Sequence, residues 1–153
     1  MVRKFRGSSL LVNNDYSIKD MADIHKAGAI IIQNRKLLVT CTKGKDIFIC
    51  PGGKIEPGET IEQCLIRECK EELSIDLTLN DFEKFDTFFA DRAEYDPSKK
   101  IRMDVFMIKS WQGTLQPSNE IGEVLWINSE LNENRKIGSI LHTRLFLNSK
   151  KLI

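Results

Sequence analysis

The chain of 153 residues has the length of one ordinary domain, and its 41% hydrophobic and 29% charged residues are typical of a globular protein. The formal net charge of +1 excludes a strong overall field that attracts nucleic acid or an anionic membrane. No apolar run approaches the about 20 residues of a membrane-spanning helix, and the four cysteines and two histidines match no zinc spacing. We therefore expect a cytoplasmic protein with reduced thiols, and neither nucleic acid nor a membrane as partner.

The N-terminus carries basic residues and a short apolar patch at Ser8–Val12. This patch is shorter than the about 7–15 apolar residues of a signal-peptide core, and no small-residue cleavage site follows it. We expect residues 1–22 to form an N-terminal extension and residues 23–153 to form one domain. A transit peptide is the alternative, because the first acidic residue is Asp15.

Strand patterns dominate the first part of the domain. The apolar, β-branched run Ala27–Ile32 predicts a buried strand, and Leu37–Thr42 predicts the returning strand of a hairpin. A short strand at Ile47–Cys50 follows. Pro51-Gly52-Gly53 is expected to end it, because this combination favours a turn.

The second half of the domain predicts three more strands and a final helix. The strands are expected at 81–92, 101–111 and 122–127, where apolar residues dominate. Residues 133–147 place their apolar side chains at helical spacing and predict a C-terminal helix. Strands interleaved with two helices on one core favour an α/β domain with a mixed β-sheet.

The segment Thr60–Leu73 predicts a helix with an acidic border. Thr60 and Gln63 form a capping-box signature, in which each side chain can satisfy the backbone N–H of the other residue. The apolar residues fall on one face, which is expected to pack against the sheet. Three glutamates, spaced i, i+3 and i+4, converge at the edge of that face: Glu68, Glu71 and Glu72.

Clustered carboxylates repel one another, and a solvated acidic helix face is the simplest interpretation. A hard divalent cation removes the repulsion, and Mg²⁺ commonly bridges one or two carboxylates to phosphates of a substrate. Gly52-Gly53, just upstream, allows the backbone to approach a ligand closely and to bind anionic oxygens through N–H groups. The combination predicts a site for a metal ion and phosphate.

The stretch from Gly53 to Ile75 resembles the Nudix box, G-x5-E-x7-R-E-U-x-E-E-x-G-U, where U is aliphatic. The matching residues are Gly53, Glu59, the pair Arg67-Glu68 and the pair Glu71-Glu72. Two positions depart from the pattern. Cys69 stands where an aliphatic residue is usual, and Ser74 replaces the last glycine, which is expected to strain or reshape the helix exit. The resemblance extends more loosely over residues 24–128.

This resemblance implies a Nudix-type α/β/α sandwich that hydrolyses a nucleoside diphosphate linked to another group, with Mg²⁺ or Mn²⁺ as cofactor. By motif position, the implied metal ligands are the Gly53 carbonyl, Glu68 and Glu72, with Glu71 assisting. Arg67 would orient the glutamates through charge-assisted hydrogen bonds, and Glu59 would support the loop. Gly52 and Gly53 would bind phosphate. Some members have a further ligand or base where Glu120 stands. Glu123 is the other candidate for this role.

The resemblance leaves the general base and the substrate open. Glu68, Glu71 and Glu120 are candidates to accept the proton of the attacking water, and motif position favours Glu68. Motifs of the ADP-ribose and dinucleoside-polyphosphate cleavers are absent, because Ala90 and Arg92-Ala93 stand at the diagnostic positions. By elimination we expect a monomer or homodimer that converts a (deoxy)nucleoside triphosphate to the monophosphate and pyrophosphate, with oxidised nucleotides as candidates.

Three alternatives remain within the same family. The first is a pyrophosphatase for ADP-ribose or a nucleotide sugar. The second is an isomerase that uses a cysteine and a metal-bound histidine, for which His25 would be the candidate. The third is a non-catalytic module that senses a nucleotide, although every charged position of the box is intact here.

Overall fold

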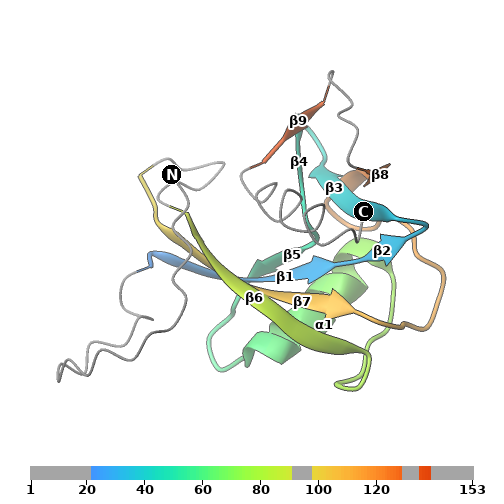
Figure 1. The fold of residues 1–153 in the computed structure, drawn as a ribbon. Helices are drawn as coiled ribbons and strands as arrows, with labels where there is room; N and C mark the ends of the chain where they lie inside the picture. Colours follow the sequence, from blue (N-terminus) through green and yellow to red (C-terminus); the bar gives the residue numbers. More distant parts are fainter. Residues whose placement is uncertain (1–21, 91–97, 129–134, 139–153) are drawn as a thin grey trace, which may run out of the picture.

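A computed structural model of the chain describes residues 22–90, 98–128 and 135–138 (Figure 1). Within these residues two mixed β-sheets pack together, and one helix covers a face of the first sheet. The elements in chain order are β1 (Ile24–Ile30), β2 (Ile32–Gln33), β3 (Lys36–Thr42), β4 (Ile47–Ile49), β5 (Gly52–Lys54), α1 (Ile61–Leu73), β6 (Phe82–Ala90), β7 (Ile101–Ile108), β8 (Ile121–Ile127) and β9 (Lys136–Ile137). The predicted α/β class with a mixed β-sheet is confirmed, although the described residues form two mixed sheets rather than one.

The first sheet has the strand order β5-β1-β7-β6. β1 runs parallel to β7 and antiparallel to β5, so it brings the start of the domain beside the glycine pair that precedes α1. α1 packs on β1 through small side chains, since Ala27 and Ala29 share a fully buried cluster with Leu65 and Cys69. Short side chains on the strand let the helix approach the sheet closely.

The second sheet contains β2, β3, β4 and β9, and β8 pairs with β3. The β3–β8 ladder joins Leu37 to Ile127 at one end and Thr42 to Ile121 at the other. A second buried cluster, which includes Val39, Phe48 and Met103, fills the space between the two sheets. This sheet therefore places the turn before β8 beside the C-terminal part of α1.

The helix agrees with the sequence pattern at both ends. Thr60 is the N-cap, and both hydrogen bonds of the capping box with Gln63 are present, at 3.1 and 2.9 Å. Ser74 ends the helix in the left-handed conformation, with φ +60°, and its N–H donates to the carbonyl of Lys70. A left-handed cap usually holds glycine, because a side chain is disfavoured at positive φ. Ser74 therefore preserves the expected exit geometry in a strained conformation.

Two sequence predictions differ from the structure. Gly52–Lys54 forms β5, because the chain leaves one sheet at Pro51 and immediately joins the edge of the other instead of turning. Lys136–Ile137 forms β9, which pairs with β4, so the predicted C-terminal helix is wrong at these residues. The other residues of that prediction, apart from 135–138, lie outside the described residues. No helix in the described ranges is long and apolar enough to cross a membrane.

Candidate metal and phosphate site

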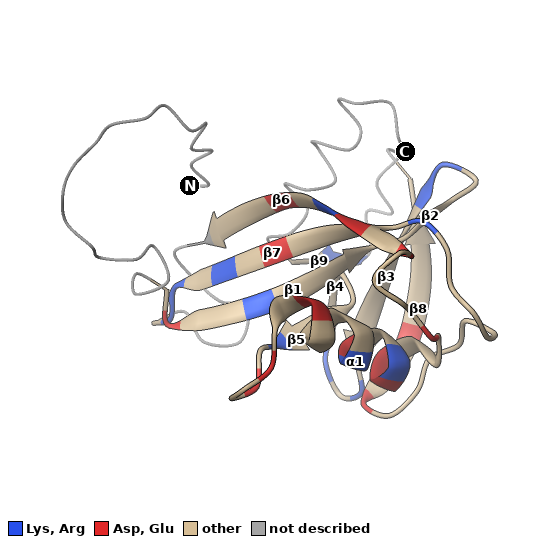
Figure 2. Ribbon diagram, turned by 90° about the horizontal axis from the view of Figure 1, so that it is seen from below, with Lys and Arg blue, Asp and Glu red and all other residues tan. Residues whose placement is uncertain are grey.

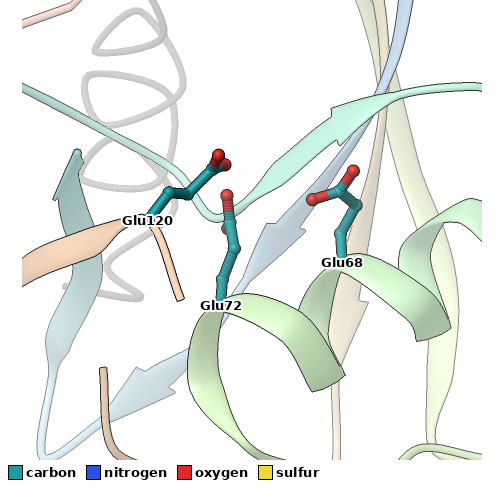
Figure 3. A group of neighbouring side chains, drawn as sticks. All are labelled: Glu68, Glu72 and Glu120. Carbon is teal, nitrogen blue, oxygen red and sulfur yellow. The ribbon is translucent and has the colours of Figure 1, made fainter. Parts of the chain in front are cut away.

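Three carboxylates meet at the edge of β5. Glu68 and Glu72 lie one turn apart on α1, and Glu120 comes from the turn before β8 (Figure 3). One oxygen of each group lies within 4.8 Å of one oxygen of each other group. Glu68 and Glu72 are 8% and 5% exposed, whereas Glu120 is exposed. Two buried acids and one exposed acid are therefore gathered in one place.

Glu120 reaches this group because the chain before it is tied to the end of α1. The backbone N–H groups of Gln116 and Ser118 donate to the carbonyls of Leu73 and Glu72, each at 3.0 Å. The last carbonyls of a helix have no partner within the helix, so these bonds also complete the helix end. On the other side, the N–H of Lys43 donates to the carbonyl of Glu120 at 2.8 Å.

The two glycines of β5 are required by close approaches of the backbone, Gly53 to α1 and Gly52 to β1, where a Cβ on Gly52 would lie 2.0 Å from the carbonyl oxygen of Ala27. The N–H of Gly52 donates to Oε2 of Glu72 at 2.9 Å. A Cβ on Gly53 would lie 2.1 Å from Oε1 of Glu68, so any other residue displaces this carboxylate. The predicted glycine loop therefore fits directly against the predicted acidic helix, and one of its amides binds a carboxyl oxygen.

Arg67 connects the loop before the helix to the carboxylate group. Its guanidinium donates to both oxygens of Glu59, at 2.7 and 3.0 Å, and to Oε1 of Glu68 at 2.8 Å. It also donates to the carbonyl of Lys54 at 3.2 Å. The hydrogen bond from Arg67 holds the pKa of Glu59 down at about 2. Charge-assisted bonds of this kind orient Glu68 and brace the loop, as the sequence analysis expects of Arg67 and Glu59. Figure 2 shows acidic and basic residues close together along α1 and in the loop before it.

Three candidates from the sequence lie outside the group. Glu71 is half exposed and contacts Arg67 at 3.3 Å on the outer side of the helix. Glu123, the rival of Glu120, pairs with Arg135 at 3.2 Å. His25 binds Asp104 at 2.5 Å, which gives the histidine of the isomerase alternative a partner outside the carboxylate group. Of the two acids considered for the last position, the structure brings Glu120 and not Glu123 to the group.

The electrostatics of the group favour a bound cation. Burial raises the pKa of Glu72 to about 8, although the hydrogen bond from Gly52 opposes the rise, and the nearby Glu68 and Glu120 raise it further. Burial also raises the pKa of Glu68, against the hydrogen bond from Arg67. Carboxylates held together in a partly dry site are stabilised as anions by a positive charge between them. The donor set is made of oxygen atoms, which suits a hard ion such as Mg²⁺ or Mn²⁺.

Sequence analysis missed a second polar cluster, centred on Asp104 in β7. Asp104 is 2% exposed and accepts bonds from His25, Lys84 (2.7 Å), Thr87 (2.5 Å) and Arg102 (3.2 Å). These groups come from β1, β6 and β7, so one carboxylate joins three strands. Its signal in the sequence is a pair of opposite charges, Arg102 and Asp104, within a mostly apolar strand, and the pattern of that strand alone does not predict their partners.

The cysteines and two phenylalanines, Phe82 and Phe106, are buried in the core. All four cysteines are buried and unpaired, and burial raises the pKa of Cys50 and Cys64 to about 12. Phe106 is 3% exposed and packs edge-on against Phe82 at 5.5 Å between ring centroids. Phe88 packs against the cluster between the sheets. These observations agree with thiols used as small apolar groups.

Comparison with known proteins identifies the family. The model of the NUDIX domain family matches residues 24–142, which is most of the chain. The chain therefore belongs to the NUDIX domain family, as the motif from Gly53 to Ile75 implies.

Individual proteins resemble this chain in sequence or in structure. The chain is 32% identical over 92 residues to an 8-oxo-dGTP diphosphatase of Proteus vulgaris, a match that covers 50% of this chain and 76% of the relative. It is 27% identical over 114 residues to the CTP pyrophosphohydrolase of Escherichia coli K12, covering 72% and 79%. Among solved structures, a MutT NUDIX hydrolase from Burkholderia pseudomallei superposes with a TM-score of 0.66 at 20% identity, covering 82% of this chain and 95% of that one.

Proposed function

We propose that the protein hydrolyses a nucleoside triphosphate to the nucleoside monophosphate and pyrophosphate, with a divalent cation at the carboxylate group. The observation that carries this proposal is the convergence of Glu68, Glu72 and Glu120 beside the amide of Gly52. Relatives named for hydrolysis of 8-oxo-dGTP and CTP support a triphosphate as the substrate class. Oxidised nucleotides belong in this class as candidates.

Each residue has a defined part in this proposal. Glu68 and Glu72 would hold the cation with Glu120, and the Gly53 carbonyl is the further ligand that motif position implies. A divalent cation bound there neutralises phosphate oxygens and lowers the pKa of a coordinated water. Arg67 keeps Glu68 in place through its bond to Oε1. Water adds to phosphorus, one P–O–P bond breaks, and a carboxylate accepts the proton of the water.

Glu68 stays our proposed proton acceptor, with Glu120 as the competitor. The exposure of Glu120 gives it access to solvent, whereas Glu68 is tied to Arg67 on one oxygen. Replacing Glu120 by Gln separates the two roles. If Glu120 is the general base, Glu120→Gln should flatten the rise of kcat with pH. If Glu120 is a metal ligand, the same substitution should raise the Mg²⁺ concentration required for activity.

A product-release screen tests the proposed function. Purified protein with Mg²⁺ is incubated with canonical and oxidised (d)NTPs, CTP, ADP-ribose, dinucleoside polyphosphates and nucleotide sugars. We expect pyrophosphate rather than inorganic phosphate from at least one triphosphate, and no turnover in EDTA. Turnover restricted to ADP-ribose or a nucleotide sugar would replace the proposal with the first alternative. Nucleotide binding without turnover of any substrate would favour the sensing module.

A further inference from the structure

Lys26 on β1 is a half-buried cation beside the carboxylate group. β1 pairs with β5 in a register that sets Lys26 opposite Lys54, followed by Ala27 opposite Gly53 and Gly28 opposite Gly52. Lys26 is therefore two residue steps, about 7 Å along the strands, from the level of the Gly52 amide that binds Glu72. Lys26 therefore lies beside the candidate site, although it is not part of the motif from Gly53 to Ile75.

The surroundings of Lys26 give it no direct counter-ion. Lys54, directly across the ladder, carries the same charge, and like charges at this position destabilise a strand pair. Within the described ranges, the lysines that form ion pairs with carboxylates are others: Lys70, Lys84, Lys109 and Lys136. A half-buried ammonium that faces a like charge and lacks a carboxylate within 4.0 Å is suited to an anion supplied from outside the chain.

Lys26 is nevertheless within electrostatic reach of the carboxylate group. Gly52, whose N–H donates to Oε2 of Glu72, is only about 7 Å along the ladder from the level of Lys26, a separation over which charges still interact. A phosphate oxygen bound beside Glu72 would therefore lie between the carboxyl group of Glu72 and the lysine.

We propose that Lys26 binds a phosphate oxygen of the nucleotide and positions the polyphosphate chain against the carboxylate group. This inference rests on the proposed function, since the anion is a nucleoside triphosphate or its pyrophosphate product. Lysine suits this task as a compact point charge on a long stem. The competing explanation is that Lys26 only offsets the repulsion between Glu68, Glu72 and Glu120.

The two explanations predict different pyrophosphate affinities for neutral variants of Lys26, and calorimetric titration measures this affinity separately from that for the cation. Mn²⁺ is titrated into the metal-free protein, and pyrophosphate is then titrated into the Mn²⁺-loaded protein. The variants are Lys26→Met, which keeps the apolar stem, Lys26→Gln as a second neutral variant, and Lys26→Arg, which keeps the charge. Lys36→Met is the matched control, because Lys36 is exposed and lies six residues, about 20 Å, from the end of β3 that adjoins Glu120.

We expect pyrophosphate affinity to fall at least about tenfold in Lys26→Met and Lys26→Gln, since a hydrogen bond to a charged group usually contributes that much. Mn²⁺ affinity should stay the same or rise, because a like charge has been removed, and KM for a triphosphate should rise with pyrophosphate affinity. Lys26→Arg should remain within about threefold of the original affinity. Unchanged pyrophosphate affinity in a folded neutral variant that binds Mn²⁺ would overturn the inference. Failure of the unaltered protein to hydrolyse any triphosphate would refute the proposed function instead, while the pyrophosphate titrations would still decide the role of Lys26.

Discussion

Replacing Glu72 by Gln should stabilise the metal-free protein, and the gain should grow with pH. Glu72 is 5% exposed, and burial raises its pKa from the ordinary value of 4.5 to about 8. Between these two values the folded protein keeps a proton that the unfolded chain has lost. Stability of the metal-free protein therefore falls as pH rises from about 4.5 to about 8, and then levels off. Gln has no proton to lose, and its side-chain oxygen can still accept the bond from Gly52.

The size of the effect follows from the change in proton affinity. A rise in pKa from 4.5 to about 8 corresponds to at most about 5 kcal/mol, at about 1.4 kcal/mol for each tenfold change. Water entry and the shared titration with Glu68 reduce this figure. We expect Glu72→Gln to be more stable than the original protein by about 2–4 kcal/mol at pH 8.5, and by less than about 1 kcal/mol at pH 5.

Urea unfolding in EDTA at pH 5 and pH 8.5 measures both differences. Glu62→Gln is the control, since Glu62 lies on the first turn of the same helix and outside the carboxylate group. It should change stability by only a few tenths of a kcal/mol, about the size of a charge–dipole interaction at a helix start. A stability difference for Glu72→Gln that is the same at both pH values would refute the reasoning from burial.

Three further substitutions test particular contacts. Ser74→Gly should relieve the left-handed strain, raise the melting temperature by about 2–4 °C in a thermal scan and leave turnover unchanged; a lower melting temperature would contradict this. Asp104→Asn should lower the free energy of unfolding in urea by about 2–3 kcal/mol, since it leaves the hydrogen-bond partners His25, Lys84 and Arg102 on three strands without their buried carboxylate; a neutral result would show that solvent replaces it. Gly53→Ala should abolish turnover and weaken Mn²⁺ binding in calorimetry, because its Cβ would displace Glu68; normal activity would mean that β5 moves aside.

Local patterns in the sequence predict the helix and most strands well. The capping box at Thr60 and Gln63 and the spacing of Glu68 and Glu72 depend only on neighbouring residues, and the structure contains both features. The strained helix exit at Ser74 is also a local feature, because a serine there occupies the left-handed conformation that usually takes glycine.

Contacts between distant segments were harder to predict. Residues after Pro51 form β5 because the edge of β1 is free to pair with them. A Pro-Gly-Gly run by itself does not show that such an edge lies nearby. Glu120 meets Glu72 because Gln116 and Ser118 bond to the end of α1, which is a long-range pairing. Lys26 and Asp104 were missed for the same reason. Their neighbours come from other strands. The alternation of apolar and polar residues along one strand does not predict which residues of another strand lie beside it.

The most direct test of the central claim compares the turnover of Glu72→Gln with that of Glu62→Gln at saturating Mg²⁺ and triphosphate. Charge stabilisation by a bound cation contributes several kcal/mol to the transition state, and each about 1.4 kcal/mol is a factor of ten in rate. The carboxylate group of Glu68, Glu72 and Glu120 therefore predicts a folded Glu72→Gln whose kcat is at least about 100-fold lower, beside a Glu62→Gln with near-normal kcat. Equal turnover in the two variants would contradict hydrolysis at this site.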